Sequence, residues 1–178
     1  MTPTVIVLGV VPGIVFVPML FEARRAAANE RALFARGGVE PAGDVYRAMQ
    51  VAYPAAFLVM IAEGAMRGGA PLSGTFAAGF VTFAAAKVVK WWAVATLGPR
   101  WTFRVLVLPK EPRIVTGPYR FVRHPNYVGV VGELIGVLLM TGAIVGGTIA
   151  IVVFGALLAR RIAVEERALG GTLARETR

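Results

Sequence analysis

The sequence contains no cysteine, which excludes disulfide bonds, thiolate metal ligands and a cysteine nucleophile. Its one histidine, His124, excludes a metal site made of several histidines from one chain, so we expect no bound metal. Acidic residues are also scarce, with 10 Asp and Glu against 19 Lys and Arg, and the formal net charge is +9. This charge would suit a nucleic-acid-binding protein. The basic residues, however, lie between long apolar runs rather than on one soluble face, so we expect no nucleic-acid partner.

What the sequence has in abundance is apolar residues. They make up 57% of its 178 positions, and the mean hydropathy is +0.68. A soluble domain could not bury this much apolar surface, whereas a lipid bilayer covers it and leaves the charged residues at the helix ends. The length suits one domain. The composition therefore predicts an all-α integral membrane bundle that forms a single domain over residues 1–178.

Five apolar segments are candidates for membrane-spanning helices. No basic residue precedes the first segment, and Arg24 and Arg25 follow it, which is the reverse of the order in a signal peptide. We therefore interpret it as a retained helix. The last two segments are short against the ~20 residues of a span; they form either two short spans, which we favour, or one hairpin that crosses only partly. The five segments are 4–20, 48–62 with a possible extension to 66, 75–97, 127–140 and 144–159.

The positions of the basic residues predict the topology. Sixteen of the 19 lie in the segments 22–47, 98–124 and 160–178, whereas the opposite connections hold only Arg67. By the positive-inside rule these three segments are cytoplasmic, which places the N-terminus outside and the C-terminus in the cytoplasm after five crossings. We expect the protein to be integral to the plasma or inner membrane of the cell, with its active site facing the cytoplasm.

The connection before the fourth apolar segment contains the residues best suited to chemistry. Gly117 and Pro118 indicate a turn, and Pro125 fits the first turn of a helix. His124 then lies at the helix entry, where free backbone N–H groups favour an anion, and Arg123 adds positive charge. This stretch predicts a site that would accept a carboxylate or a phosphate.

Three ionisable residues lie inside the apolar segments. Lys87 and Lys90 belong to the third, and Glu133 lies about two turns into the fourth. A carboxylate at that depth is costly, so it should face the bundle and have a partner. Two interpretations stand side by side: a functional role close to the substrate, or a structural pairing with Lys87, Lys90 or an arginine. Small residues nearby indicate a close-packing helix face: Gly129, Gly132 and Gly136.

A pair of glutamates follows the last apolar segment. Taken alone, Glu165 and Glu166 are typical of a solvated helix end, with Arg161 pairing to Glu165 four residues away. Together with the upstream stretch, they resemble the signature of the isoprenylcysteine carboxyl methyltransferase superfamily, which includes phospholipid N-methyltransferases and bacterial relatives. That signature is R-H-P-x-Y-x-G, a helical hairpin, then E-E-x-x-L. It matches Arg123-His124-Pro125-Asn126-Tyr127-Val128-Gly129 and Glu165-Glu166-Arg167-Ala168-Leu169.

The resemblance covers residues 86–170, a family-like core, and leaves 1–85 as variable N-terminal helices. It implies S-adenosylmethionine as the methyl donor, bound on the cytoplasmic side. Carried over to this chain, the cofactor-binding residues are His124, Pro125, Tyr127, Glu165 and Glu166, with Gly117 and Tyr119 lining the same pocket.

The methyl acceptor is suggested by the segment 101–109. It resembles a bacterial subgroup, linked to polyketide synthases, that methylates the hydroxyl of alkylpyrones or alkylresorcinols. We therefore favour O-methylation of a phenolic or pyrone lipid that enters from the bilayer. The catalytic candidates are Glu133 and, because positive charge helps to ionise such a hydroxyl, Arg104 and Arg123. Methylation of a prenylated cysteine carboxylate is the second choice, and N-methylation of phosphatidylethanolamine is the third.

A different class of function also stays open. The protein could be a non-catalytic membrane scaffold or a small transporter. In a transporter, Glu133, Lys87 and Lys90 would form an ion path through the bilayer.

Overall fold

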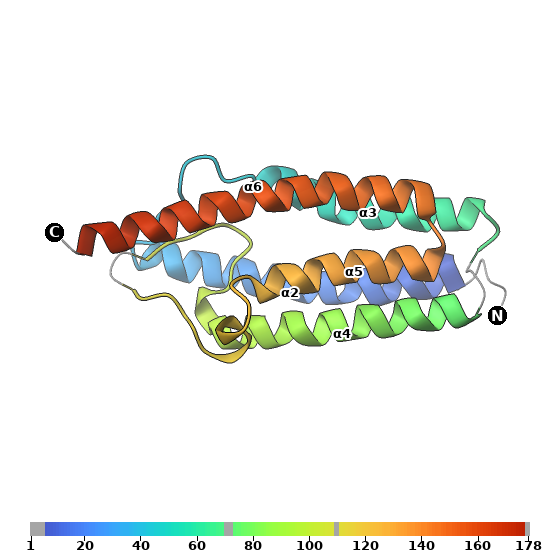
Figure 1. Ribbon diagram of the computed structural model, residues 1–178, viewed down its shortest axis with the longest axis horizontal. Coiled ribbons are helices and arrows are strands. Elements are labelled where there is room, and N and C mark those ends of the chain that lie inside the picture. Colours follow the sequence, from blue (N-terminus) through green and yellow to red (C-terminus); the bar gives the residue numbers. More distant parts are fainter. Residues whose placement is uncertain (1–5, 70–72, 109–110, 177–178) are drawn as a thin grey trace.

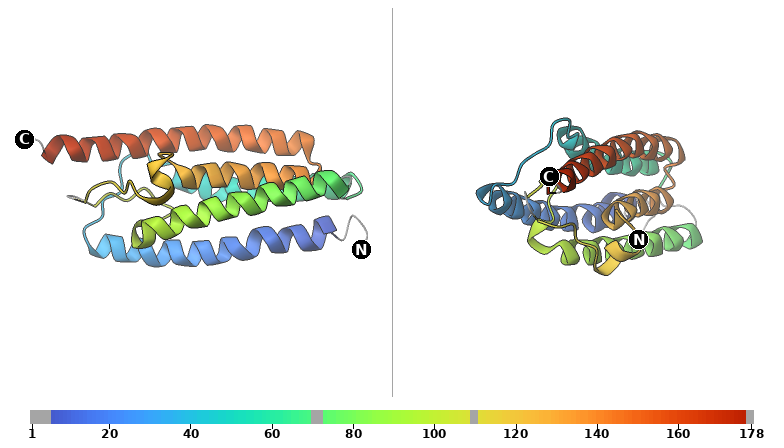
Figure 2. Two further views of the ribbon diagram at one scale, coloured as in Figure 1. Left: turned by 60° about the horizontal axis from the view of Figure 1, so that its bottom comes forward. Right: turned by 60° about the vertical axis from the view of Figure 1, so that its left-hand side comes forward.

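A computed structural model describes residues 6–69, 73–108 and 111–176. Consecutive long helices run in opposite directions, so that α2 begins and α6 ends at opposite ends of the bundle (Figures 1 and 2). The elements are η1 (Ile6–Val10), α2 (Val11–Ala35), α3 (Tyr46–Met66), α4 (Ser73–Leu97), η2 (Gly98–Arg100), η3 (Gly117–Arg120), α5 (Pro125–Thr141) and α6 (Ile144–Glu176).

The predicted all-α membrane bundle is confirmed. Each predicted segment falls within a helix, although residues 4 and 5 of the first lie outside the described residues. Four helices of the described chain are long and apolar enough to span a membrane, and α5, with 17 residues, is shorter. At 1.5 Å per residue it rises about 25 Å, close to the lower limit for a span. The last two segments are thus two separate helices.

Two helices extend well beyond the apolar segments from which they were predicted. α2 continues to Ala35 and α6 to Glu176. The hydrophobic run of α6 ends at Arg160, but the chain keeps its helical conformation past Glu165 and Glu166. This extension brings both glutamates alongside the beginning of α5.

The contact between α4 and α5 is close because glycines line it. A Cβ atom on Gly136 would lie 2.7 Å from the Cβ of Phe83 and 2.9 Å from the carbonyl oxygen of Gly79. A Cβ atom on Gly129 would lie 2.7 Å from the Cβ of Lys90. The predicted close-packing face is therefore present, and it brings the backbones of α4 and α5 together.

Four charged side chains form a cluster inside the bundle, which we call the buried charge cluster: Glu22 on α2, Lys87 and Lys90 on α4, and Glu133 on α5. Lys87 Nζ lies 2.9 Å from Glu22 and 3.1 Å from Glu133. Lys90 Nζ lies 2.6 Å from Glu22 and 3.2 Å from Glu133, and the Tyr53 hydroxyl donates to Glu133 at 2.6 Å. Two positive and two negative groups compensate one another, which is what burial of charge in a membrane requires.

The turn between α5 and α6 fixes where α6 starts. Gly142 ends α5 with a φ of 68°, a left-handed conformation that suits glycine. The carboxylate of Glu63 on α3 accepts hydrogen bonds from the backbone N–H groups of Val145 at 3.1 Å and Gly146 at 2.6 Å. A carboxylate at a helix N-terminus satisfies free donors and favours the helix dipole, so Glu63 anchors α6 to α3.

We predict that Gly136→Ala destabilises the protein by about 1–3 kcal/mol, because the added methyl group overpacks the contact between α4 and α5. Gly155→Ala is the matched control: it lies inside α6, and a Cβ there would meet no atom within 4 Å. That change should leave stability unchanged or raise it by up to about 1 kcal/mol through helix propensity. Unfolding midpoints in detergent measure both. Equal midpoints for the two variants would contradict the close approach.

Candidate active site

Two loops cover one end of the bundle. Val39, in the connection after α2, and Val107, in the loop after α4, form an antiparallel bridge with two backbone hydrogen bonds of 3.0 Å. Arg104 pairs with Glu40 at 2.9 Å, which joins the same two loops. These two contacts join the loop after α2 to the loop after α4, and we call the joined loops the cap.

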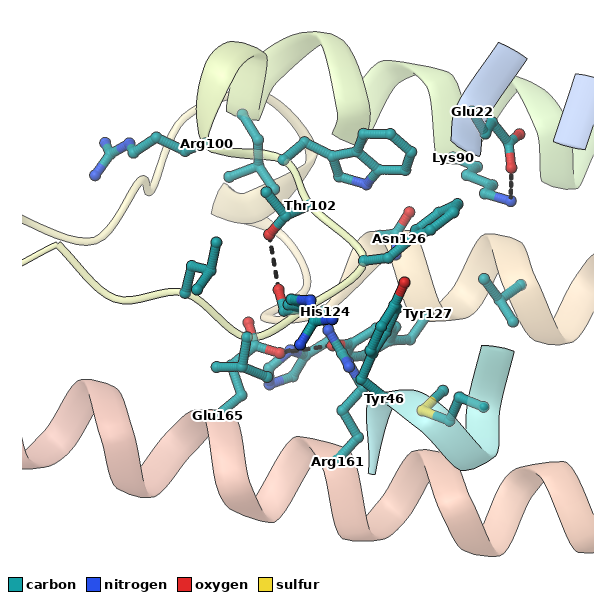
Figure 3. Close-up of a pocket in the computed structure, with 18 of the residues that line it drawn as sticks. Glu22, Tyr46, Lys90, Arg100, Thr102, His124, Asn126, Tyr127, Arg161 and Glu165 are labelled. Atoms are coloured by element: carbon teal, nitrogen blue, oxygen red, sulfur yellow. Dashed lines mark hydrogen bonds and ion pairs between the residues drawn. The ribbon is translucent and has the colours of Figure 1, made fainter. Parts of the chain in front are cut away.

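A cavity of about 370 Å³ lies beneath this cap, between the loops and the helices (Figure 3). Its lining combines apolar and ionisable side chains. Apolar side chains from the helices, among them Met19, Leu33, Val130 and Phe154, line one part, and ionisable side chains line another. The cavity can thus hold a molecule, or two molecules, with both an apolar and a charged portion. The ionisable lining includes Arg113, Tyr119, Arg123, His124, Arg161 and Glu165.

The beginning of α5 and the far part of α6 form one wall of the site. His124 Nε2 lies 2.8 Å from Glu166 Oε1, and the Tyr127 hydroxyl donates to Glu165 Oε2 at 2.7 Å. The His124 and Tyr127 rings stack with centroids 5.4 Å apart, as their three-residue spacing on one helix allows. The structure therefore brings together the two halves of the motif, 38 and 42 residues apart in the chain.

Two arginines neutralise Glu166. Arg113 lies 3.2 Å from Glu166 Oε1, and Arg123 lies 3.7 Å from Glu166 Oε2. The Arg123 side chain is 79% exposed, so it is free to turn toward a bound anion. Sequence reasoning missed Arg113, because one arginine in a basic loop is indistinguishable from those that only set topology.

An ion pair between Arg161 and Asp44 holds Tyr127 of the wall in place. Arg161 donates from Nε to the Tyr127 hydroxyl at 2.9 Å and from its guanidinium to Asp44 at 3.1 Å. Asp44 also accepts from the backbone N–H of Val105 at 3.0 Å. Arg161 is 5% exposed, so the alternative of a solvated helix end does not hold here. The only signal for Asp44 in the sequence is that it is the single aspartate of the chain.

The remaining predicted cofactor-binding residues lie around the same pocket. Tyr119 lines the cavity, and burial, reinforced by the charge of Glu165, raises the pKa of its phenol. The phenol is therefore a hydrogen-bond donor at neutral pH. Gly117 adopts a φ of 56°, and a Cβ atom there would lie 2.5 Å from Thr96 Oγ1. Pro125 is buried at the start of α5. In the described part of the chain, Gly117, Pro125 and Glu166 adjoin the cavity lining rather than belong to it.

Two of the catalytic candidates have their charge already balanced. Arg104 lines the cavity, but it pairs with Glu40 and Glu30 and lies over the Tyr46 ring. Glu133 belongs to the buried charge cluster, behind the cavity lining formed by other residues. Of the two interpretations offered for Glu133, the structure shows the structural pairing, with both Lys87 and Lys90.

A membrane-spanning helical bundle with a capped cavity at one end, and a histidine, glutamates and arginines on its wall, is the architecture of an integral membrane enzyme. The family model for the isoprenylcysteine carboxyl methyltransferase (ICMT) family matches residues 78–171. This is more than half of the chain, so the chain belongs to this family and is a membrane methyltransferase. The match spans α4, the loop after it, α5 and the part of α6 that contains both glutamates.

Two curated bacterial proteins are similar over most of their length. The uncharacterized protein YpbQ of Bacillus subtilis is 29% identical over 156 residues, which is 88% of this chain and 92% of the relative. An uncharacterized protein of Haemophilus influenzae is 26% identical over 142 residues, covering 79% of this chain and 82% of the relative. No solved structure matches the chain significantly.

We predict that Asp44→Ala destabilises the protein by about 3–5 kcal/mol, because it leaves the buried guanidinium of Arg161 without its counter-charge. Glu40→Ala is the matched control, since it lies in the same connection and removes a partly exposed ion pair with Arg104. Such pairs contribute about 0–1 kcal/mol. Unfolding midpoints of the two variants in detergent give the comparison. Equal losses would show that Asp44 does not brace the site.

Proposed function

We propose that this protein is an S-adenosylmethionine-dependent O-methyltransferase, and that its acceptor is the hydroxyl of a phenolic or pyrone lipid. The proposal rests chiefly on one observation. The His124–Glu166 and Tyr127–Glu165 contacts form a polar wall on a cavity that apolar side chains from the helices also line. A soluble, charged donor and a lipophilic acceptor would therefore find suitable surfaces in one space.

The donor set of the wall fits S-adenosylmethionine, which contains a carboxylate, an ammonium group, ribose hydroxyls and a sulfonium. Arg113 and Arg123 suit the carboxylate, because each pairs with a carboxylate in the structure. Glu165 and Glu166 suit the ammonium group or the ribose hydroxyls. The protonated phenol of Tyr119 adds a hydrogen-bond donor. When bound, this cofactor would supply an electrophilic methyl group: the methyl carbon would exchange its bond to sulfur for a bond to the hydroxyl oxygen. The products would be S-adenosylhomocysteine, a methyl ether and the released hydroxyl proton.

The residues of the chain need only bind, orient and exclude water, since displacement at a methyl carbon depends on alignment. The cap joined by the Val39–Val107 bridge covers part of the cavity, since Val107 also lines it. The apolar lining, with Met19, Leu33 and Phe154, suits a lipid tail that enters from the bilayer. Arg104 and Arg123 both line the cavity. Because Arg104 is already paired with Glu30 and Glu40, Arg123 is the better placed of the two to help an acidic hydroxyl ionise.

A second candidate acceptor is the carboxylate of a prenylated cysteine, which the description of the matching family favours. Phosphatidylethanolamine N-methylation is the third. The transporter alternative receives less support, because each member of the buried charge cluster is paired with a residue on a neighbouring helix. Fixed mutual pairing suits a structural role better than an ion path.

We predict that the purified protein binds S-adenosylhomocysteine in detergent, and that His124→Ala or Glu166→Ala abolishes this binding, because each removes one side of the 2.8 Å contact on the wall. Isothermal titration calorimetry measures the affinity. Arg167→Ala is the matched control: Arg167 neighbours Glu166 and is exposed, and among the described residues its side chain bonds only to Ala163 on its own helix. It should bind like the wild type.

Failure of the intact wild-type protein to bind S-adenosylhomocysteine would overturn the methyltransferase proposal. Loss of binding in Arg167→Ala to the same extent as in Glu166→Ala would show that the effect is general to this part of α6. The wall would then not be the cofactor site.

We predict that labelled S-adenosylmethionine transfers its methyl group to pentadecylresorcinol when the protein is embedded in nanodiscs. N-acetyl-S-farnesylcysteine and phosphatidylethanolamine are offered in parallel under the same conditions. Extraction and thin-layer separation identify the labelled lipid. Labelling of the farnesylcysteine alone would replace the phenolic acceptor by the second candidate.

A further inference from the structure

Two buried polar atoms that line the cavity lack hydrogen-bond partners among the described residues: Trp101 Nε1 and Asn126 Oδ1. Trp101 is 2% exposed, so its N–H group cannot reach bulk water. Leaving a buried donor or acceptor unpaired costs about 1–3 kcal/mol, and buried polar atoms are nearly always satisfied. Two such atoms in one cavity therefore point to a ligand that supplies the missing partners.

These atoms lie on a different side of the cavity from the polar wall. Trp101 packs with Ala26 and Val94, on α2 and α4. Figure 3 shows Asn126 on the side of Glu22 and Lys90, whereas His124 and Glu165 lie toward α6. Trp101, packed against α2 and α4, and Asn126 thus belong to a different part of the lining from His124 and Glu165. This separation assigns them to the other reactant.

The chemistry of the two atoms restricts what that reactant presents. An indole N–H only donates a hydrogen bond, and an amide oxygen only accepts one. A hydroxyl does both, so it satisfies Trp101 and Asn126 together. A carboxylate only accepts, which leaves Asn126 Oδ1 unpaired, and an ammonium group only donates, which leaves Trp101 Nε1 unpaired.

Other polar groups of the lining do not offer the same opportunity. Glu22 and Lys90 also line the cavity, but they pair with each other at 2.6 Å. Arg104 is held by Glu40 and Glu30. Among the described residues of the lining, the fully buried polar side-chain atoms without a hydrogen-bond partner therefore belong to Trp101 and Asn126.

We propose that Trp101 and Asn126 are the acceptor-binding residues, and that they select a protonated hydroxyl on the lipid. The inference rests on the proposed function and deepens it, because it derives the hydroxyl class of acceptor from hydrogen-bonding capacity. It also assigns a role to the residue between Pro125 and Tyr127 in the motif.

The test compares two ligands that differ only in their hydroxyl groups: pentadecylresorcinol and pentadecylbenzene. Binding of each to the protein in nanodiscs is measured together with the affinity for S-adenosylhomocysteine. The variants are Trp101→Phe, which removes the N–H and keeps an aromatic ring, and Asn126→Leu, which keeps the approximate shape. Trp92→Phe is the matched control, since Trp92 is 49% exposed on the same helix end.

We expect the wild type to prefer pentadecylresorcinol over pentadecylbenzene by roughly tenfold. Each of Trp101→Phe and Asn126→Leu should reduce this preference about threefold, since each removes one of the two hydrogen bonds. The affinity for S-adenosylhomocysteine should change less than twofold, and Trp92→Phe should keep both properties. Unfolding midpoints confirm that the variants are folded. If a variant fails to fold, the lipid preference of the wild type still tests the inference, because that measurement needs no substitution.

Equal binding of the two lipids by the wild type would overturn the inference. So would a loss of S-adenosylhomocysteine affinity in Trp101→Phe that exceeds the loss for the lipid, because the two atoms would then belong to the cofactor. Either result leaves the proposed function standing as long as the wild type binds S-adenosylhomocysteine. Absence of that binding is the separate outcome that removes the proposed function.

Discussion

The mutual neutralisation of Glu22, Lys87, Lys90 and Glu133 is the interaction on which the rest of the structure depends. A lone charge in the hydrocarbon core is expensive, so these four side chains hold α2, α4 and α5 in one arrangement (Figure 1). Two of them, Glu22 and Lys90, also line the cavity. The depth and position of the cavity are therefore set by a charge balance, and the glycines between α4 and α5 make the approach possible.

The candidate cofactor-binding glutamates depend on a second set of contacts, which hold α6 at two places. Near its start the carboxylate of Glu63 satisfies free N–H groups, and farther along Arg161 is bound by Asp44. Between these anchors α6 is one continuous helix, so Glu165 and Glu166 are carried to His124 and Tyr127. The proposed chemistry, alignment of a charged donor with a lipid acceptor, uses this rigidity rather than a reactive side chain.

Patterns within single segments of the sequence predicted the features that depend on those segments alone, such as the positions of the helices. Hydropathy located each long helix of the described chain, and the resemblance placed His124 and Glu166 in one pocket, whereas their direct contact is a finding of the structure. The end of α6 was missed, because Arg160 and Arg161 end the apolar run while the helix continues. Asp44 was missed because its partner lies 117 residues away, and the role of Glu133 stayed open because its neighbours lie on other helices. Pairings of this kind depend on the assembled bundle, which no single segment of sequence describes.

The distribution of the site over the chain has a consequence for its biosynthesis. One side of the cavity comes from α2, α3 and the loops, whereas Arg161, Glu165 and Glu166 all lie on α6, which leaves the ribosome after them. Asp44 is therefore synthesised before Arg161, and its carboxylate has no guanidinium partner until α6 has entered the bilayer. The order of translation thus delays closure of the cavity, and in a nascent chain that stalls before α6 the cavity stays open on one side.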